Sequence, residues 1–167
     1  MTCWDRVPIK PIPRAEEPFS HWFMDVGGPL SSEKLPYNYF LVLCDSMSRF
    51  PVAYALRNVN SRTICDSLLQ LFSFVGVPSY LSMDNATYNV SQWTQEMIKR
   101  VGVSPRFITP YHSPADGLVE RLVSSTKSLI AKVAAENPKS WHKHLGYIMW
   151  ALREVPNETT HVPPALL

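Results

Sequence analysis

The sequence predicts an α/β fold, in which a mixed five-stranded sheet (three antiparallel strands, then alternating strands and helices) is flanked by helices. The first observation behind this prediction is the order of the expected elements, β-β-β-α-β-α-β-α-α. The second is the distribution of the 15 prolines, which gather at both ends and around residue 110 and leave long proline-free stretches between them. The third is composition: of 167 residues, 46% are hydrophobic and 18% are charged, which is typical of one globular domain.

Three antiparallel strands are expected first. Residues 21–26 alternate between two faces and end at a Gly-Gly-Pro turn. Residues 37–44 are mostly apolar, which is typical of a strand buried on both faces. Residues 49–56 form the third strand, and Pro51, which has no N–H to donate, favours an edge position for it. Because these strands follow one another through short connections, we expect them to form a meander.

The rest of the chain alternates between helices and strands. A helix begins at Asn60 or Ser61, whose side chains suit an N-cap, and ends before Gly76. Apolar periodicity and helix-breaking residues predict the later elements: a strand over residues 79–83, a helix over 91–101, a strand over 104–108, and helices over 115–135 and 139–153. Three tryptophans at helical positions are expected in the core: Trp93, Trp141 and Trp150.

Composition also excludes several classes of protein. No apolar run is long enough for a membrane span, and residues 1–13 lack the apolar segment of a secretory signal. The three widely spaced cysteines do not suit a disulfide scaffold. The net charge is only +2, but residues 97–144 carry eight basic and three acidic side chains, so this stretch is +5 and the remainder −3. This asymmetry is a modest indication of a polyanionic partner, although a solvated helical face gives the same pattern.

Three carboxylates stand out by their positions. Asp25 lies in the first strand, Asp84 follows the fourth strand and Glu120 lies near the start of the long helix. Each alone has an ordinary explanation as a turn, cap or helix-dipole residue. At 100° per residue, Glu120, Ser124 and Lys127 share one helix face, and the first and last are about 10 Å apart along the axis. The opposite face is expected to pack on the core through Leu118, Leu122, Leu129 and Val133.

Other polar residues have simpler explanations. Asp45 lies in the turn DSMS at residues 45–48, where an Asp side chain can bond the backbone, so we expect a structural role. Cys3 is an isolated thiol, and a closed zinc site needs four ligands, so no zinc is expected. The proline-rich residues 1–17 are expected to be an extended linker that leads into one domain over residues 18–167.

Taken together, the three carboxylates resemble the D,D-35-E triad of retroviral and long-terminal-repeat retrotransposon integrases, with 35 residues between Asp84 and Glu120. Four stretches are similar to motifs of this family, and of its gypsy-type members in particular: WFMDVGGPL at residues 22–30, CDSMSRF at 44–50, YHSPADGLVER at 111–121, and LREVPN at 152–157 with Pro163 and Pro164 after it. The resemblance identifies residues 18–167 as an integrase catalytic core. Residues 1–17 would then be the remnant of a connection from an N-terminal zinc module, which is absent here.

The resemblance implies an RNase H-like fold in which Asp25, Asp84 and Glu120 converge as catalytic and metal-binding residues. The implied function is DNA integration by a nucleic-acid-binding polynucleotidyl transferase. Such an enzyme processes the 3′ ends of retroelement DNA and joins them to a target duplex. Two Mg²⁺ or Mn²⁺ ions would be held by the three carboxylates, because these cations prefer oxygen ligands and leave positions open for phosphates.

The same resemblance implies partners and further site residues. Lys127 is expected to contact the end of the element's DNA, with the other DNA-binding residues being Arg121, His112, Tyr111 and Ser124. We expect a loop role for His112 rather than an acid–base one. The expected partners are retroelement DNA ends, a target duplex and further copies of the chain in a homodimer or higher oligomer. Neither membrane association nor secretion is expected, and action on chromosomal DNA implies the nucleus.

Three residues around Asp84 depart from the family pattern. The family usually has Ser or Thr directly before this Asp, Gly two residues after it and an aromatic residue five after it, where this chain has Met83, Ala86 and Asn89. Ala in place of Gly matters if the loop needs a positive φ. One alternative is therefore a decayed or domesticated integrase fold that binds DNA or protein without turnover. A second is a true RNase H-type nuclease, against which the integrase-like motifs argue.

Overall fold

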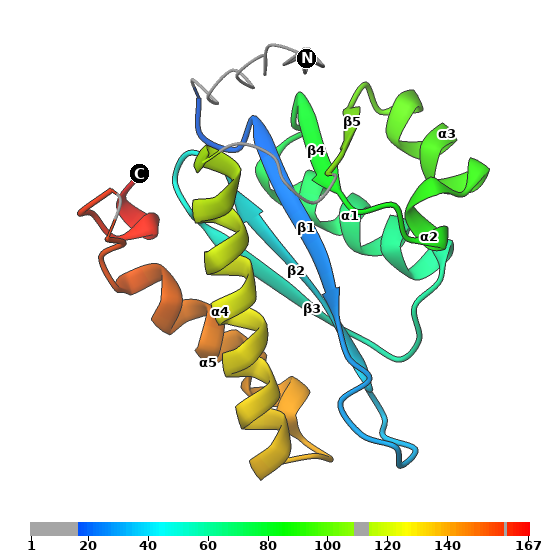
Figure 1. Cartoon of the computed structure of the whole chain (residues 1–167), viewed down its shortest axis with the longest axis vertical. Helices are drawn as coiled ribbons and strands as arrows, with labels where there is room; N and C mark the ends of the chain where they lie inside the picture. Colours follow the sequence, from blue (N-terminus) through cyan, green and yellow to red (C-terminus); the bar gives the residue numbers. More distant parts are fainter. Residues whose placement is uncertain (1–16, 109–113, 159) are drawn as a thin grey trace, which may run out of the picture.

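The computed structural model describes residues 17–108, 114–158 and 160–167. These residues contain five strands: β1 (His21–Gly27), β2 (Tyr39–Asp45), β3 (Pro51–Leu56), β4 (Tyr80–Met83) and β5 (Ser104–Phe107). They form one mixed sheet in the order β3-β2-β1-β4-β5 (Figure 1). β1 and β3 each pair antiparallel with β2, whereas β4 pairs in parallel with both β1 and β5. The expected mixed sheet is confirmed, and Pro51 lies in an edge strand as predicted.

The helices of the described residues are α1 (Ser61–Val75), α2 (Thr87–Val90), α3 (Gln92–Arg100), α4 (Pro114–Glu136) and α5 (Trp141–Glu154), with a 3-10 turn η1 (Pro164–Leu166). The long helices lie within two residues of their expected bounds. The sequence analysis missed α2 and η1, because a single turn is too short to show helical periodicity. None of the described helices combines the length and apolar character that a membrane crossing requires.

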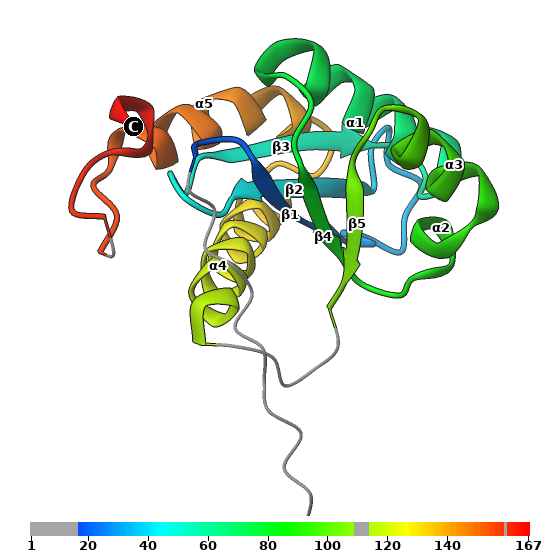
Figure 2. The ribbon, with the colours of Figure 1, turned by 90° about the horizontal axis from the view of Figure 1, so that it is seen from above.

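The sheet has helices on both faces (Figure 2). On one face, Trp22, Met24 and Leu43 pack against the apolar sides of α1 and α3. On the other face, Phe23 and Val42 pack against α4 and α5. Alternate residues of β1 and β2 therefore belong to different halves of the core, as the period of two in a strand requires. This arrangement holds β1, the central strand, rigidly between two packed layers.

The ends of α1 illustrate how local sequence sets the element bounds. Asn60 accepts a hydrogen bond from the Thr63 backbone N–H at 2.9 Å, and the Thr63 hydroxyl oxygen accepts one from the Asn60 backbone N–H at 3.2 Å. This reciprocal cap satisfies two N–H groups that the first turn of a helix otherwise leaves without partners. At the other end Gly76 has a φ of 90°, a conformation that favours glycine. The N-cap and the terminating glycine are both confirmed.

Two of the three tryptophans expected in the core are not buried. Trp141, the first residue of α5, is fully buried in the core with Phe40 and Val42 of the sheet, but Trp93 is 66% and Trp150 64% exposed. Both lie on the outer sides of amphipathic helices whose opposite sides already fill the available core. Periodicity alone could not distinguish these positions from buried ones.

The orientation of α4 also differs from the expected one. Of the four residues assigned above to the core face, Leu122 and Val133 are partly buried against the core, Leu129 is 37% exposed, and the side chain of Leu118 lies outside the described part. The buried side chains of α4 are instead Val119, Val123, Thr126, Ile130 and Ala134. The true core face is therefore turned by about one residue, roughly 100°, from the expected one. As a result the face that carries Glu120 and Lys127 does not point away from the core. It lies beside the core face and is directed along the sheet toward β1.

Candidate active site

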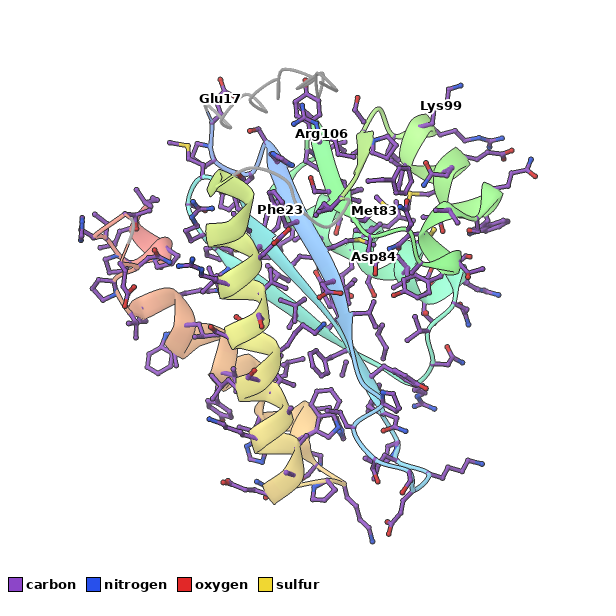
Figure 3. All side chains as sticks on the ribbon, in the orientation of Figure 1. Glu17, Phe23, Met83, Asp84, Lys99 and Arg106 are labelled. Carbon is purple, nitrogen blue, oxygen red and sulfur yellow. The ribbon has the colours of Figure 1, made fainter. Side chains whose placement is uncertain are left out.

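The carboxyl ends of two neighbouring parallel strands create the site. β1 and β4 run side by side in the same direction, with Trp22 opposite Leu81 and Phe23 opposite Ser82. Asp25 lies near the end of β1. Asp84, which is labelled in Figure 3, follows the last residue of β4. Strand ends that meet at one edge of a parallel sheet are a usual place for a binding site. The two aspartates, which are 59 positions apart in the sequence, thus come to the same edge.

A cavity of about 540 Å³ lies at this edge, between the sheet and α4. It is lined by all three carboxylates expected to be catalytic and by two of the expected DNA-binding residues, with apolar side chains between them: Asp25, Asp84, Glu120, Ser124, Lys127, Phe23, Met24, Asn85, Ile108 and Val123. The carboxylates come from three different elements. The convergence implied by the family resemblance is therefore present at the level of a shared cavity.

Asp25 is joined to α4 by an ion pair. The Lys127 ammonium donates to Asp25 Oδ2 at 2.7 Å, while Asp25 Oδ1 accepts from the Val26 backbone N–H at 2.8 Å. The Lys127 side chain is 30% and the Asp25 side chain 40% exposed. A pair this accessible to water contributes about 1 kcal/mol or less, because solvent screens it. Lys127 therefore donates to one Asp25 oxygen but does not hold the carboxylate rigidly in place.

Asp84 is held by its own downstream turn. Its Oδ1 accepts from the Asn89 side-chain amide at 2.7 Å and from the Ala86 backbone N–H at 3.3 Å. Ala86 itself has a φ of −60° and a ψ of 147°, which any L-residue adopts without strain. The loss of the family's glycine at this position therefore imposes no backbone penalty on the loop.

Glu120 occupies the second turn of α4 and is exposed. Among the described residues, no three His, Cys, Asp or Glu side chains lie close enough together to hold one metal ion in the present arrangement. The donor set nevertheless suits a hard divalent cation, since it consists of carboxylate oxygens that face a common cavity. Lys127 and Asn89 now engage oxygens of two of these carboxylates.

The other expected DNA-binding residues are distributed differently. Ser124 lines the cavity one turn from Glu120, as their spacing on the helix predicted. Arg121 is exposed and lines a different cavity, together with Arg49 and the C-terminal segment around Pro156. Tyr111 and His112 lie outside the described residues. Their DNA-binding roles remain predictions.

Two residues near the site were not assigned a role from the sequence. Asn89 was noted only as a departure from the family pattern, and its contact with Asp84 could not be foreseen because α2 was missed. Tyr88, its neighbour, packs partly buried against the core. Burial, followed by the negative charges of Asp84 and Asp25, raises the pKa of Tyr88 to about 12. Its phenol thus stays protonated at neutral pH and presents a neutral group to the carboxylates.

Asp45 has the structural role that the sequence indicated. Its carboxylate accepts hydrogen bonds from the Ser48 backbone N–H and hydroxyl, both at 2.7 Å, and from the Phe19 backbone N–H at 3.0 Å. Burial raises the pKa of Asp45, while the hydrogen bonds from Ser48 and Phe19 act in the opposite direction. This aspartate closes the β2–β3 turn and is not part of the cavity.

Comparison with known proteins gives a consistent result. The model of a family described as "integrase core domain" matches residues 15–113. The chain is 29% identical over 157 residues to the Pro-Pol polyprotein of simian foamy virus type 3 (strain LK3), an alignment that covers 94% of this chain and 14% of the polyprotein. The chain thus spans only a small part of this relative's length.

Two solved structures have similar folds. The chain superposes on a simian T-cell lymphotropic virus intasome in complex with PP2A regulatory subunit B56 gamma, with a TM-score of 0.75 and 24% identity, covering 96% of this chain and 58% of that one. It also superposes on the HTLV-2 integrase catalytic core domain in complex with magnesium, with a TM-score of 0.73 and 21% identity, covering 92% of this chain and 98% of that one. At these identities the likeness concerns the fold, and it confirms the expected RNase H-like architecture.

Proposed function

The chain belongs to the integrase core domain family, and we propose on that basis that it is a polynucleotidyl transferase that processes retroelement DNA ends and joins them to target DNA. The observation that carries the proposal is the single cavity lined by Asp25, Asp84, Glu120 and Lys127. Three carboxylates and one ammonium in one cavity suit phosphodiester chemistry, which needs cations at the reacting phosphate and a cationic contact to the backbone.

Divalent metal is the cofactor that these residues suit. Asp25, Asp84 and Glu120 would hold Mg²⁺ or Mn²⁺, and two ions are proposed because the cavity presents three separate carboxylates. Once bound, the metal would neutralise phosphate charge and favour deprotonation of the attacking oxygen. The HTLV-2 structure with a similar fold was solved in complex with magnesium, which supports this choice of ion.

The proposed reaction has two steps. In end processing, a water oxygen bonds to phosphorus and the bond to the 3′ oxygen breaks, which leaves a 3′-hydroxyl on the element. In strand transfer, that hydroxyl attacks a target phosphate and displaces a target 3′ oxygen. The Lys127 ammonium positions the element's backbone, and Ser124, one turn away on the same side of α4, provides a neutral contact to it. Such an activity requires access to chromosomal DNA, so we propose the nucleus as its location.

Self-association is part of the proposal. A groove of about 510 Å³ crosses the exposed edge of β3 between α1 and α5, and Phe74 and Gly146 line it. Phe74 is 89% exposed, and Tyr147 and Trp150, on the same helix as Gly146, are 73% and 64% exposed. Large exposed aromatic side chains on the two helices beside a groove are typical of interaction surfaces. We define Phe74, Tyr147 and Trp150 as the α1/α5 face and propose that a second copy covers it.

The decayed-integrase alternative loses its main support. Its sequence basis was the replacement of glycine by Ala86, but the ordinary backbone angles of Ala86 show no need for glycine there. The three carboxylates of the triad are also all present and line one cavity. No observation specifically favours a binding module without turnover.

A disintegration assay tests the proposal. Purified chain is incubated with branched DNA and Mg²⁺ or Mn²⁺, and the wild type is compared with Asp84→Asn and Glu120→Gln. Each variant keeps the shape of the side chain and removes its charge, so we expect the metal-dependent products to fall by at least 100-fold. Glu136→Gln serves as a matched control, because this exposed carboxylate at the far end of α4 lies outside the cavity. Absence of products from a folded wild type that binds both metal and DNA would contradict the proposed activity.

A further inference from the structure

Asn89 places a polar amide where the integrase family usually has an aromatic side chain. It is 2% exposed and lies on α2, the single turn that follows Asp84. Its side-chain nitrogen donates to Asp84 Oδ1 at 2.7 Å and lies 3.2 Å from the Asp84 backbone oxygen. We propose that Asn89 is a positioning residue that orients the Asp84 carboxylate for a divalent cation. This inference rests on the proposed function, since it concerns the same cavity.

The two oxygens of Asp84 have different surroundings. Oδ1 accepts from Asn89 and from the Ala86 backbone N–H, and both donors belong to the turn after β4. Within the described part of the chain, no donor contacts Oδ2. Because Asp84 lines the cavity, fixing one oxygen against the turn leaves the other for a cation. Hydrogen bonds of this kind to a metal-binding carboxylate restrict its rotation and raise its affinity for metal.

The orientation of the Asn89 amide follows from the charge of Asp84. The Asn89 Oδ1 atom is buried and accepts no hydrogen bond from the described residues. Reversing the amide would place this oxygen against Asp84 Oδ1, where two acceptors would repel each other. The present orientation thus leaves one buried acceptor unsatisfied in order to donate to the aspartate. A residue needed only to fill space here would be more favourable if it were apolar, because it would bury no unsatisfied group.

The turn that carries Asn89 is itself anchored. The Gln95 side-chain amide donates to the Asn89 backbone oxygen at 2.6 Å, and the Thr94 hydroxyl donates to the Tyr88 backbone oxygen at 2.6 Å. Ser91 and Ser61 exchange a hydrogen bond at 2.7 Å that ties the start of α3 to the start of α1. The first two contacts hold α2 against α3, and the third joins α3 to α1. The Asn89 amide is therefore in place before a cation arrives, as a positioning group must be.

The test is a Mn²⁺ titration of the full chain, in which free Mn²⁺ is followed by electron paramagnetic resonance. Asn89→Leu keeps the number and branching of the side-chain heavy atoms but has no donor, and it also removes the unsatisfied acceptor. We expect Mn²⁺ affinity to fall about tenfold, while the melting temperature without metal stays equal or rises. In the disintegration assay kcat should fall, with KM for DNA unchanged. A merely structural role for Asn89 would lower the melting temperature instead and leave Mn²⁺ affinity intact.

Gln92→Met is the matched control, because it removes an exposed amide of α3 that bonds Glu96 and contacts neither Asn89 nor Asp84. We expect it to keep wild-type Mn²⁺ affinity. Asn89→Ser, a smaller residue whose hydroxyl does not reach Asp84, replaces the leucine variant if that protein fails to fold, with the same expectation for Mn²⁺. Equal Mn²⁺ affinity in the wild type and the folded Asn89 variant would overturn the inference.

The outcomes separate this inference from the proposed function. Weaker Mn²⁺ binding by the Asn89 variant, in a chain that joins no DNA, would support the positioning role and refute the proposed activity. Normal DNA joining with unchanged Mn²⁺ affinity in the variant would refute the positioning role alone. A wild type that binds no Mn²⁺ would overturn both, because Asp84 would then have no cation to be oriented for.

Discussion

His21 makes the stability of the domain depend on pH, and the size of this effect follows from its surroundings. The ring is 3% exposed, bonds the Ser82 hydroxyl through Nε2 at 2.7 Å and stacks near Phe23 at 4.8 Å. Burial, and then the positive charge of Arg106, lowers the pKa of His21 from 6.5 to about 4. The folded protein therefore keeps this histidine neutral at pH values where the unfolded chain protonates it.

The sign follows from proton binding. Above pH 6.5 neither state carries the proton, so His21 makes no difference to stability. As the pH falls below 6.5 the unfolded chain takes up a proton that the folded protein refuses, and the free energy of unfolding decreases until about pH 4. At about 1.4 kcal/mol per pH unit the full loss is about 3 kcal/mol, and about 2 kcal/mol of it is already present at pH 5.

Urea denaturation of the wild type and of His21→Gln at pH 7.5, 6.5, 5.8 and 5.0 measures this loss. Glutamine stays neutral throughout and can still bond Ser82. We expect the difference in unfolding free energy between the two proteins to shift by about 2 kcal/mol toward the variant between pH 7.5 and 5.0. His144→Gln, the same substitution at an exposed position of α5, is the matched control. Parallel pH curves for the wild type and His21→Gln would show that the reasoning is wrong.

Two further predictions concern the cavity and the α1/α5 face. Lys127→Met should raise Mn²⁺ affinity roughly fivefold, because the ammonium no longer competes for Asp25 Oδ2. It should also lower the salt dependence of DNA binding by about one phosphate contact. Lys132→Met, on the exposed side of α4, is the control, and unchanged Mn²⁺ affinity in Lys127→Met would refute the competition. Trp150→Glu should shift the chain from dimer to monomer in sedimentation velocity. Trp93→Glu on α3, the control, should leave the dimer intact. A wild type that is already monomeric at 100 µM would contradict self-association through the α1/α5 face.

The long elements of the fold could be predicted because their signals are local. The alternation of residues 21–26, the cap at Asn60 and the glycine at position 76 each act within a few residues. The position of Trp150 and the rotation of α4 could not be predicted in the same way, since they depend on which helix faces the sheet has room to cover. The sheet covers the side of α4 that carries Val119, Val123 and Ile130, and Leu129, one position away from Ile130, is left partly in solvent. The pattern of hydrophobic residues alone does not show which side of a helix the sheet covers.

The three carboxylates were singled out by their spacing and motifs, but the contacts that Asp25 and Asp84 make were not foreseen. Lys127 reaches Asp25 across 102 positions, a contact that exists only because β1 and α4 are packed together. Asn89 reaches Asp84 across five positions, yet a single helical turn has no periodicity to reveal it. In both cases the carboxylate could be identified from the sequence, but the side chain that contacts it could not.

The two aspartates of the cavity are contacted by partners of different kinds. Asp25 and Asp84 would repel each other if both faced the cavity with no nearby positive charge or donor. Lys127 supplies charge to one, and Asn89 with Ala86 supplies donors to the other. The contact between Asn89 and Asp84 is the more rigid of the two, because Asn89 is buried and its backbone is held by Gln95. The ion pair between Lys127 and Asp25 is exposed and weak. We therefore expect a divalent cation at Asp25 to compete with Lys127 and to leave the contact between Asn89 and Asp84 intact.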